Sequence, residues 1–265
     1  MACFVRPSGD IHYQLDGQGP TITFVHGVGS YLESWDGVIK ALGLGFCTLQ
    51  YDLRGHGQSA KVPGPYALAD FVDDLTDLLD HLGINKTTLV GFSLGGLIAQ
   101  AFALAHPDKL EKMVLVSTIA GRTDEERRRV QKRAQTLAQE GALSHLAEAV
   151  DRWFTADFII AHPEVLEERR RRSLNNDPGC YAAAYRVLAE ADLADELHRI
   201  AVPTLAMTGE RDVGSTPHMT KLIAEKVQWG HYHILPRLKH SVLLEAPNQV
   251  GEQILGFLDN CCHMP

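Results

Sequence analysis

The chain has 265 residues, 45% of them hydrophobic, so it can bury one large core. Its formal net charge of −8 leaves no basic excess to neutralise phosphates, which argues against a nucleic-acid partner. No apolar run is long enough for a signal peptide or a membrane span, and the five scattered cysteines lack metal-ligand spacing and are typical of reduced thiols. We therefore expect a cytoplasmic protein without a membrane partner.

The first third of the chain predicts a hairpin, two buried strands and one amphipathic helix. Short alternating runs in 3–15 flank a Ser-Gly-Asp turn, which favours a hairpin. Residues 21–25 and 46–51 are rich in β-branched and aromatic side chains, as buried strands require. We interpret 52–59, which contains an aspartate, an arginine and a histidine, as a structural loop held by hydrogen bonds from side chains to the backbone. Apolar residues at helical spacing over 68–82 predict a helix whose five aspartates face solvent.

A glycine-rich loop, His26-Gly27-Val28-Gly29, directly follows the first predicted buried strand. At the carboxyl end of a strand, such a loop lets backbone N–H groups point into a crevice. The Val28 N–H would then be one donor of an oxyanion hole. Without a nucleophile nearby, the same four residues would be an ordinary glycine turn.

The pentapeptide Gly91-Phe92-Ser93-Leu94-Gly95 has the form G-x-S-x-G and lies between a β-type run at 87–90 and a long helical run. A serine in the sharp turn from a strand into a helix adopts a strained backbone, and the flanking glycines remove Cβ atoms that would clash. Its hydroxyl would stand clear of the sheet, and the Leu94 N–H would face an attacked carbonyl. The motif also occurs by chance in turns, so a catalytic Ser93 requires a base, an acid and a second oxyanion donor elsewhere.

Strands continue to alternate with helices up to about residue 121, which predicts a parallel sheet with right-handed crossovers. From there to 198 the periodicity is helical without a strand signal. A helical insertion after a sheet strand lies over the carboxyl ends of the strands, so we predict a core in two parts, 1–121 and 199–265, and a helical cap at 122–198. We expect the arginine runs of the cap, 127–129, 132–133 and 169–172, to be solvated helix faces.

Two residues of the insertion, Arg152 and Trp153, have two possible roles. An aromatic residue beside an arginine would suit a pocket for an acidic substrate. The alternative is that Trp153 anchors the core of the cap.

The end of the chain supplies candidates for the acid and the base. A predicted strand at 202–208 leads to Asp212, and a final strand at 232–235 leads to His240. Ser93, Asp212 and His240 follow in the order nucleophile, acid, base, each just past a predicted strand. Glu210 competes for the acid role, and we prefer Asp212 because it lies farther past its strand. Among 13 histidines, His240 has the placement of a base.

These segments together resemble an α/β-hydrolase: 26–29, 52–59, 91–96, 209–212 and His240. The resemblance implies a mostly parallel central sheet flanked by helices, with a helical cap, and a Ser-His-Asp triad. Within that superfamily, Gly64-Pro65-Tyr66, Arg152-Trp153-Phe154-Thr155 and Ala191-Asp192-Leu193 resemble the 3-oxoadipate enol-lactonase branch. Members of that branch hydrolyse a small carboxylated lactone.

The working hypothesis is a serine hydrolase of a small ester or lactone, with a carboxylated substrate expected, as in 3-oxoadipate enol-lactone hydrolysis. Arg152, Trp153 and Tyr185 are the candidate substrate contacts. The expected partner is a small-molecule substrate, and no metal or organic cofactor is implied. A carbon–carbon bond hydrolase of ring-cleavage products and an amide hydrolase of maleamate-like acids are compatible with the same residues. A ligand receptor with an idle triad is a third reading. The sequence gives no indication of an oligomeric state.

Overall fold

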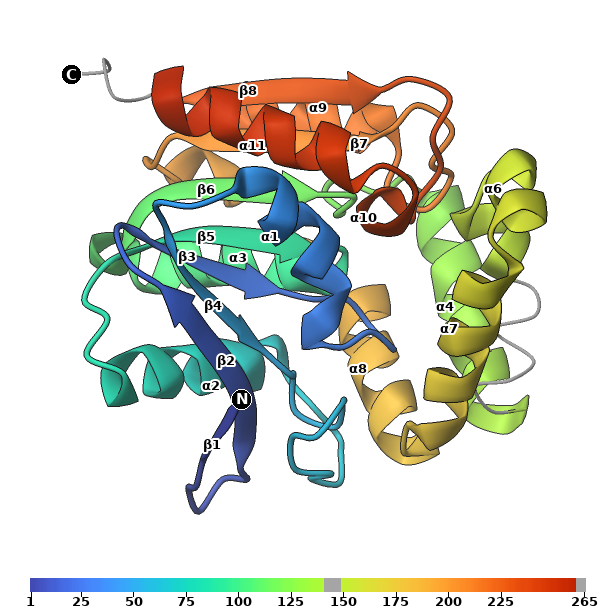
Figure 1. Cartoon of the computed structure of the whole chain (residues 1–265). Coiled ribbons are helices and arrows are strands. Elements are labelled where there is room, and N and C mark those ends of the chain that lie inside the picture. Colours follow the sequence, from blue (N-terminus) through green and yellow to red (C-terminus); the bar gives the residue numbers. More distant parts are fainter. Residues whose placement is uncertain (141–148, 261–265) are drawn as a thin grey trace.

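Eight strands form one sheet in the computed structural model, which describes residues 1–140 and 149–260. The strands are β1 (Ala2–Phe4), β2 (Ile11–Gly17), β3 (Thr21–Val25), β4 (Cys47–Tyr51), β5 (Thr87–Phe92), β6 (Leu110–Val116), β7 (Thr204–Gly209) and β8 (Gly230–Leu235). Their order across the sheet is β1-β2-β4-β3-β5-β6-β7-β8 (Figure 1). From β4 onward every neighbouring pair is parallel, and β1 and β2 add an antiparallel edge. The carboxyl ends of the parallel strands therefore meet at one edge of the sheet.

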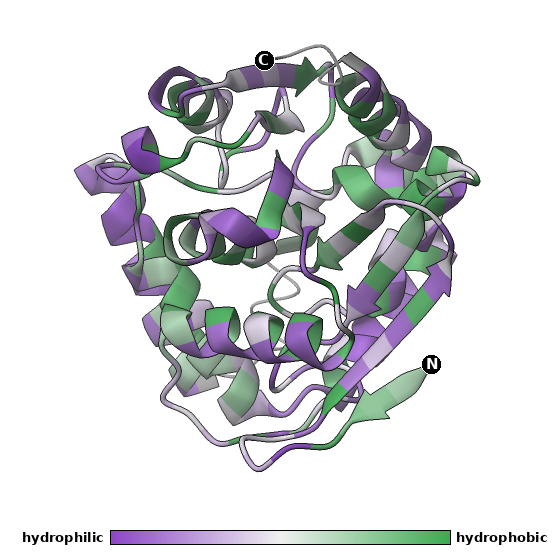
Figure 2. Cartoon of the chain, turned by 90° about the vertical axis from the view of Figure 1, so that its left-hand side faces the viewer, coloured by the Kyte–Doolittle hydropathy of each residue, from purple (hydrophilic) through white to green (hydrophobic). Residues whose placement is uncertain are grey.

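Helices cover both faces of the sheet. One face packs on α1 (Asp36–Leu42) and α11 (Pro247–Asn260), and the other on α2 (Leu68–His81), α3 (Leu94–Ala105) and α9 (Pro217–Lys226). Side chains of the strands alternate between the two cores, so that Val90 and Phe92 of β5 face α1 and α11 while Leu89 faces α3. Short helices lie between these elements: η1 (Leu32–Trp35), η2 (Pro107–Lys109) and α10 (Val242–Glu245). In Figure 2 the helices carry hydrophilic and hydrophobic bands, as amphipathic helices do.

The helix α2 has the predicted amphipathic pattern, but its aspartates are not all solvated. Asp74 is only 2% exposed and lies between two arginines. Arg54 donates to both oxygens of Asp74, from Nε at 2.7 Å and from Nη2 at 2.6 Å, and Arg6 pairs with the same carboxylate. The prediction of a fully solvated face was wrong at Asp74, because buried guanidinium groups from two distant segments require a buried anion.

Between β6 and β7 the described residues form only helices and loops. The helices are α4 (Asp124–Glu140), a helical turn at 149–153, α6 (Ala156–Ala161), α7 (Pro163–Asn175), α8 (Pro178–Glu190) and η3 (Leu197–Arg199). Figure 1 shows α4, α6, α7 and α8 beyond the carboxyl ends of the strands. We call residues 122–198 the helical insertion. Its two ends are tied together, because the Asp192 carboxylate accepts the backbone N–H groups of Gly121 at 2.9 Å and Arg122 at 3.0 Å.

The cysteines in the described residues, Cys3, Cys47 and Cys180, are free thiols, and Cys261 and Cys262 lie outside the described residues. Within the same residues, the apolar stretches of the helices are too short to cross a membrane.

Candidate active site

Ser93 occupies the turn between β5 and α3 with a backbone that few non-glycine residues adopt. Its φ is 53° and its ψ is −113°. The two glycines of the pentapeptide are required by close backbone contacts. A Cβ on Gly91 would lie 2.3 Å from the Gly95 carbonyl oxygen, and a Cβ on Gly95 would lie 2.1 Å from the Val25 carbonyl oxygen. The strained turn predicted from the G-x-S-x-G pattern is therefore present.

Asp212 and His240 are brought together from the ends of β7 and β8. Asp212 Oδ2 lies 2.7 Å from His240 Nδ1, and Asp212 is only 3% exposed. The other oxygen of Asp212 accepts the N–H groups of Gly214 at 2.8 Å and Ser215 at 2.9 Å. These donors fix the carboxylate, which in turn orients the imidazole.

The competing acid, Glu210, points elsewhere. Its Oε2 accepts the backbone N–H of Arg237 at 2.8 Å, and the residue is exposed. The preference for Asp212 as the partner of His240 agrees with this geometry.

The loop 26–29 lies directly beside Ser93. A Cβ on Gly27 would lie 3.0 Å from Ser93 Cβ, a tight contact that favours glycine here. Within the described residues, no backbone carbonyl accepts the Val28 N–H. The Leu94 N–H is the first of α3, and the N–H groups of a helix's first turn have no acceptor within the helix. Both N–H groups named by the sequence as oxyanion donors are thus available.

His26 holds this loop against the segment after β4. Its Nδ1 lies 2.8 Å from the Gly27 carbonyl oxygen, and its Nε2 accepts the Leu53 N–H at 3.0 Å. Burial lowers the pKa of His26, so the ring is neutral and can accept at Nε2. His26 is therefore a structural bridge between the two loops.

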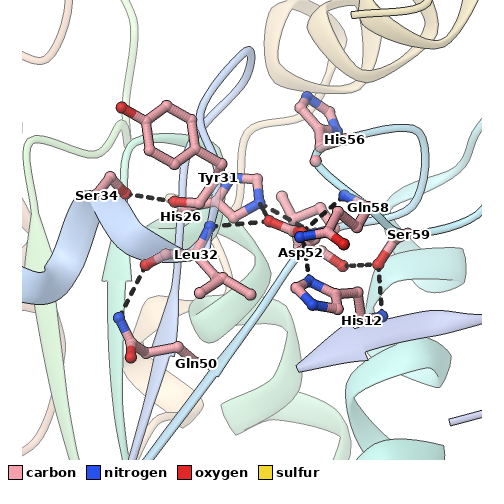
Figure 3. Close-up of polar contacts among 12 residues, drawn as sticks. His12, His26, Tyr31, Leu32, Ser34, Gln50, Asp52, His56, Gln58 and Ser59 are labelled. Atoms are coloured by element: carbon pink, nitrogen blue, oxygen red, sulfur yellow. Dashed lines mark hydrogen bonds and ion pairs between the residues drawn. The ribbon is translucent and has the colours of Figure 1, made fainter. Parts of the chain in front are cut away.

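The segment 52–59 is organised by Asp52, as Figure 3 shows. Its Oδ1 accepts the Leu32 N–H at 2.9 Å, and its Oδ2 accepts the Gln58 N–H at 2.8 Å and lies 2.9 Å from His12 Nδ1. Asp52 therefore ties its own segment to the start of η1 and to β2, and the interpretation of a structural loop is confirmed. Arg54 does not pair with Asp52 but turns to the α2 helix.

A cavity of about 280 Å³ joins these groups. Ser93, His240, Asp212 and Val28 line it from the sheet side, and the predicted contacts Arg152, Trp153 and Tyr185 line it from the helical insertion. The insertion adds further arginines, so the lining includes Arg122, Arg129, Arg133, Arg152 and Arg169, and Glu126 is the only acid that the described residues of this segment contribute. The cavity is therefore basic, and its size suits a small molecule. Among the described residues, no three His, Cys, Asp or Glu side chains are grouped to hold a metal ion.

Sequence reasoning missed Arg169, which it assigned to a solvated arginine run. Arg170 and Arg171 are exposed and pair with Glu167 and Glu168, as expected. Arg169 instead lines the cavity, with its guanidinium carbon 4.4 Å from the Trp153 ring centroid. The run of four arginines does not distinguish Arg169 from its exposed neighbours, because the partner that holds it, Trp153, comes from a different segment.

The helical insertion is fastened to the loop that carries His240. The Ser241 N–H donates to the Trp153 carbonyl at 2.9 Å. Four residues later, Glu245 accepts the Thr155 N–H at 3.0 Å and the Thr155 hydroxyl at 2.6 Å. The position of Trp153 in the cavity wall is thus coupled to the position of the imidazole.

Comparisons with known proteins agree with this arrangement. The family model described as the alpha/beta hydrolase fold matches residues 20–247. A 3-oxoadipate enol-lactonase from Acinetobacter baylyi is 32% identical over 246 residues, 92% of this chain and 91% of that protein. An (E)-2-((N-methylformamido)methylene)succinate hydrolase from the same organism is 31% identical over 251 residues, 94% of each chain. The crystal structure of the enol-lactonase from Burkholderia xenovorans superposes with a TM-score of 0.91 at 30% identity, covering 97% of this chain and 100% of that one.

The chain therefore belongs to the α/β-hydrolase fold family, and its relatives include enol-lactonases and other hydrolases. The predicted fold class and the resemblance to the enol-lactonase branch are both confirmed.

Proposed function

We propose that this protein is a serine hydrolase that cleaves a small carboxylated ester or lactone, as in the hydrolysis of 3-oxoadipate enol-lactone. The observation that carries the proposal is the hydrogen bond between Asp212 Oδ2 and His240 Nδ1, 2.7 Å long, in a basic cavity that Ser93 also lines. Enol-lactonase relatives at about 30% identity over nearly the whole chain support the substrate class.

In the first half of the reaction, Ser93 Oγ attacks the carbonyl carbon while His240 Nε2 takes the hydroxyl proton. Negative charge develops on the former carbonyl oxygen, where the N–H groups of Val28 and Leu94 can donate. Asp212 holds Nδ1 protonated and stabilises the imidazolium. Collapse of the intermediate breaks the bond to the leaving oxygen, which receives the proton from His240.

In the second half, water attacks the acyl group on Ser93. His240 takes a proton from this water, the same N–H groups hold the oxyanion, and the ester bond to Ser93 breaks with return of a proton to its oxygen. A carboxylic acid is released. These steps use only side chains and backbone N–H groups of the chain.

The helical insertion acts in this proposal as a cap that excludes bulk water and selects the substrate. Its arginines favour a substrate with a negative charge, because a buried guanidinium group gains most from a carboxylate partner. Its attachment to the His240 loop through Trp153 and Thr155 holds the imidazole in a fixed position relative to the bound substrate.

A second candidate is suggested by the relative named for hydrolysis of an (N-methylformamido)methylene succinate. In that reading the same groups act on a small acid that carries an amide. The nucleophile, base and oxyanion donors are unchanged, and only the leaving group differs.

The test compares hydrolysis of 3-oxoadipate enol-lactone with that of a neutral ester of similar size, in the wild type and in Ser93→Ala. We expect the lactone to be preferred and the variant to lose at least about 10³-fold in kcat/KM. If the wild type cleaved only the neutral ester, the acidic-substrate part would fail. Equal rates for the wild type and the variant would refute the serine mechanism.

A further inference from the structure

Arg169 of α7 differs from the other arginines around the cavity in the state of its guanidinium group. Its Nε is buried and makes no hydrogen bond within the described part of the chain. Among the described residues, the groups that contribute to its electrostatic environment are the phenols of Tyr31 and Tyr181, and no carboxylate is one of them. Burial accordingly lowers the pKa of Arg169. Within residues 1–140 and 149–260, this cation at the wall of the cavity that Ser93 lines is thus without an anionic partner.

Neighbouring arginines of the same wall already have protein partners. Arg122 Nη1 donates to the Leu188 carbonyl at 2.8 Å. Arg133 Nε donates to the Tyr185 hydroxyl at 3.3 Å. These two side chains support the helical insertion, whereas Arg169 Nε has no acceptor among the described residues.

The next arginine along the same face of α7 explains how Arg169 is held in place. Arg172 lies with its guanidinium carbon 3.5 Å from the Tyr31 ring centroid and pairs with Glu33 at 3.2 Å. Tyr31 and Glu33 directly follow the glycine-rich loop beside Ser93. Arg172 therefore fixes α7 against this loop, and Arg169, one turn earlier, is aimed at the cavity.

Stacking on Trp153 determines which part of Arg169 can bind. The guanidinium carbon lies over the indole ring, 4.4 Å from its centroid. A ring in this position contacts the guanidinium group without taking up its N–H donors, which remain for an acceptor. A planar edge with several parallel N–H donors matches the two oxygens of a carboxylate and discriminates against a neutral group.

We propose that Arg169 binds the carboxylate of the substrate through its N–H edge and is the specificity-determining residue for acidic over neutral substrates. This inference rests on the proposed function for the identity of the reaction, but the binding step can be measured without turnover. Trp153 acts as the positioning residue that holds the guanidinium plane.

The experiment uses Arg169→Met, which removes the charge at similar length, and Arg169→Lys, which keeps the charge but loses the edge. Arg170→Met is the matched control, because Arg170 is the next residue on α7, is exposed and pairs with Glu167. Hydrolysis of neutral p-nitrophenyl acetate reports on the reacting groups. Succinate, glutarate and adipate are added as competitive inhibitors, with the corresponding diamides as uncharged counterparts.

In the wild type, we expect at least one of the diacids to inhibit more strongly than its diamide. Arg169→Met should raise the inhibition constant of that diacid by about 30-fold or more and leave that of the diamide within about threefold. Arg169→Lys should fall between the two, and Arg170→Met should match the wild type. The kcat/KM for 3-oxoadipate enol-lactone should fall with the diacid affinity in Arg169→Met, while that for the neutral ester should stay within about threefold.

Three results would overturn the assignment of Arg169. The first is equal inhibition of the wild type by diacids and diamides. The second is a change in Arg169→Met no larger than that in Arg170→Met. The third is an equal loss of neutral-ester and lactone hydrolysis, which would mean a structural role. Failure of the proposed function has a separate signature, namely ester hydrolysis that survives Ser93→Ala. Binding of the diacid, measured by calorimetry, would still test Arg169 in that case.

Discussion

Replacing Asp212 by asparagine tests the arrangement of the site with little change in shape. The carbonyl oxygen of the asparagine can take the place of Oδ1 and accept the N–H groups of Gly214 and Ser215, now at 2.8 and 2.9 Å. Its amide nitrogen then faces His240 Nδ1 and the Thr208 hydroxyl in place of Oδ2. Thr208 can adapt, because its hydroxyl already donates to the Ser215 carbonyl at 2.9 Å and can accept from the amide.

His240 cannot adapt without losing its role. To accept from the new amide, Nδ1 must give up its proton, so the neutral ring carries its proton on Nε2. That tautomer cannot take the proton of Ser93, and the stabilising charge of Asp212 is also gone. We expect kcat/KM to fall by about 10³- to 10⁴-fold, equivalent to about 4–5.5 kcal/mol of transition-state stabilisation. The free energy of unfolding should change by less than about 2 kcal/mol.

The assay is kcat/KM for a neutral chromogenic ester, measured beside the denaturant midpoint of each variant. Glu210→Gln is the control, because Glu210 is the other carboxylate near the end of β7 and binds the Arg237 N–H instead of the imidazole. It should keep activity within about threefold of the wild type. Activity of Asp212→Asn within tenfold of the wild type, or an equal loss in Glu210→Gln, would refute the assignment of Asp212.

Two further predictions concern stability. Asp74→Asn removes the charge shared by two buried guanidinium groups and should lower the free energy of unfolding by about 3–5 kcal/mol in denaturant titrations. The control is Asp73→Asn at the exposed neighbour, which should cost less than about 0.5 kcal/mol. Similar costs for the two variants would contradict the account of Asp74. Burial lowers the pKa of His56 from 6.5 to about 3, so the unfolded chain binds a proton at this residue below pH 6.5 that the folded chain does not. The free energy of unfolding should therefore fall as the pH drops from 6.5 toward 3, and His56 should account for about 2 kcal/mol of the fall between pH 7.5 and 5. His56→Asn should remove that part of the fall. An unchanged pH dependence in the variant would argue against a neutral buried His56.

The sequence by itself determined the features that depend on local geometry. The turn at Ser93 requires glycines at 91 and 95 because backbone carbonyls approach within van der Waals distance, and that requirement is visible as a motif. The order of Ser93, Asp212 and His240 was equally informative. Each residue follows a strand of a parallel sheet, and the topology of such a sheet brings all strand ends to one edge.

Only the tertiary structure decided the direction of the long charged side chains. Asp74 and Arg169 each lie in a run of similar charges, so the pattern favoured solvent for both. Asp74 is buried because Arg6 and Arg54 reach it from two loops distant in the sequence. Arg169 faces the cavity because Trp153 and Tyr31 come from segments outside α7. Whether a flexible charged side chain is buried depends on what the rest of the fold packs against it, and periodicity within one helix carries no information about those partners.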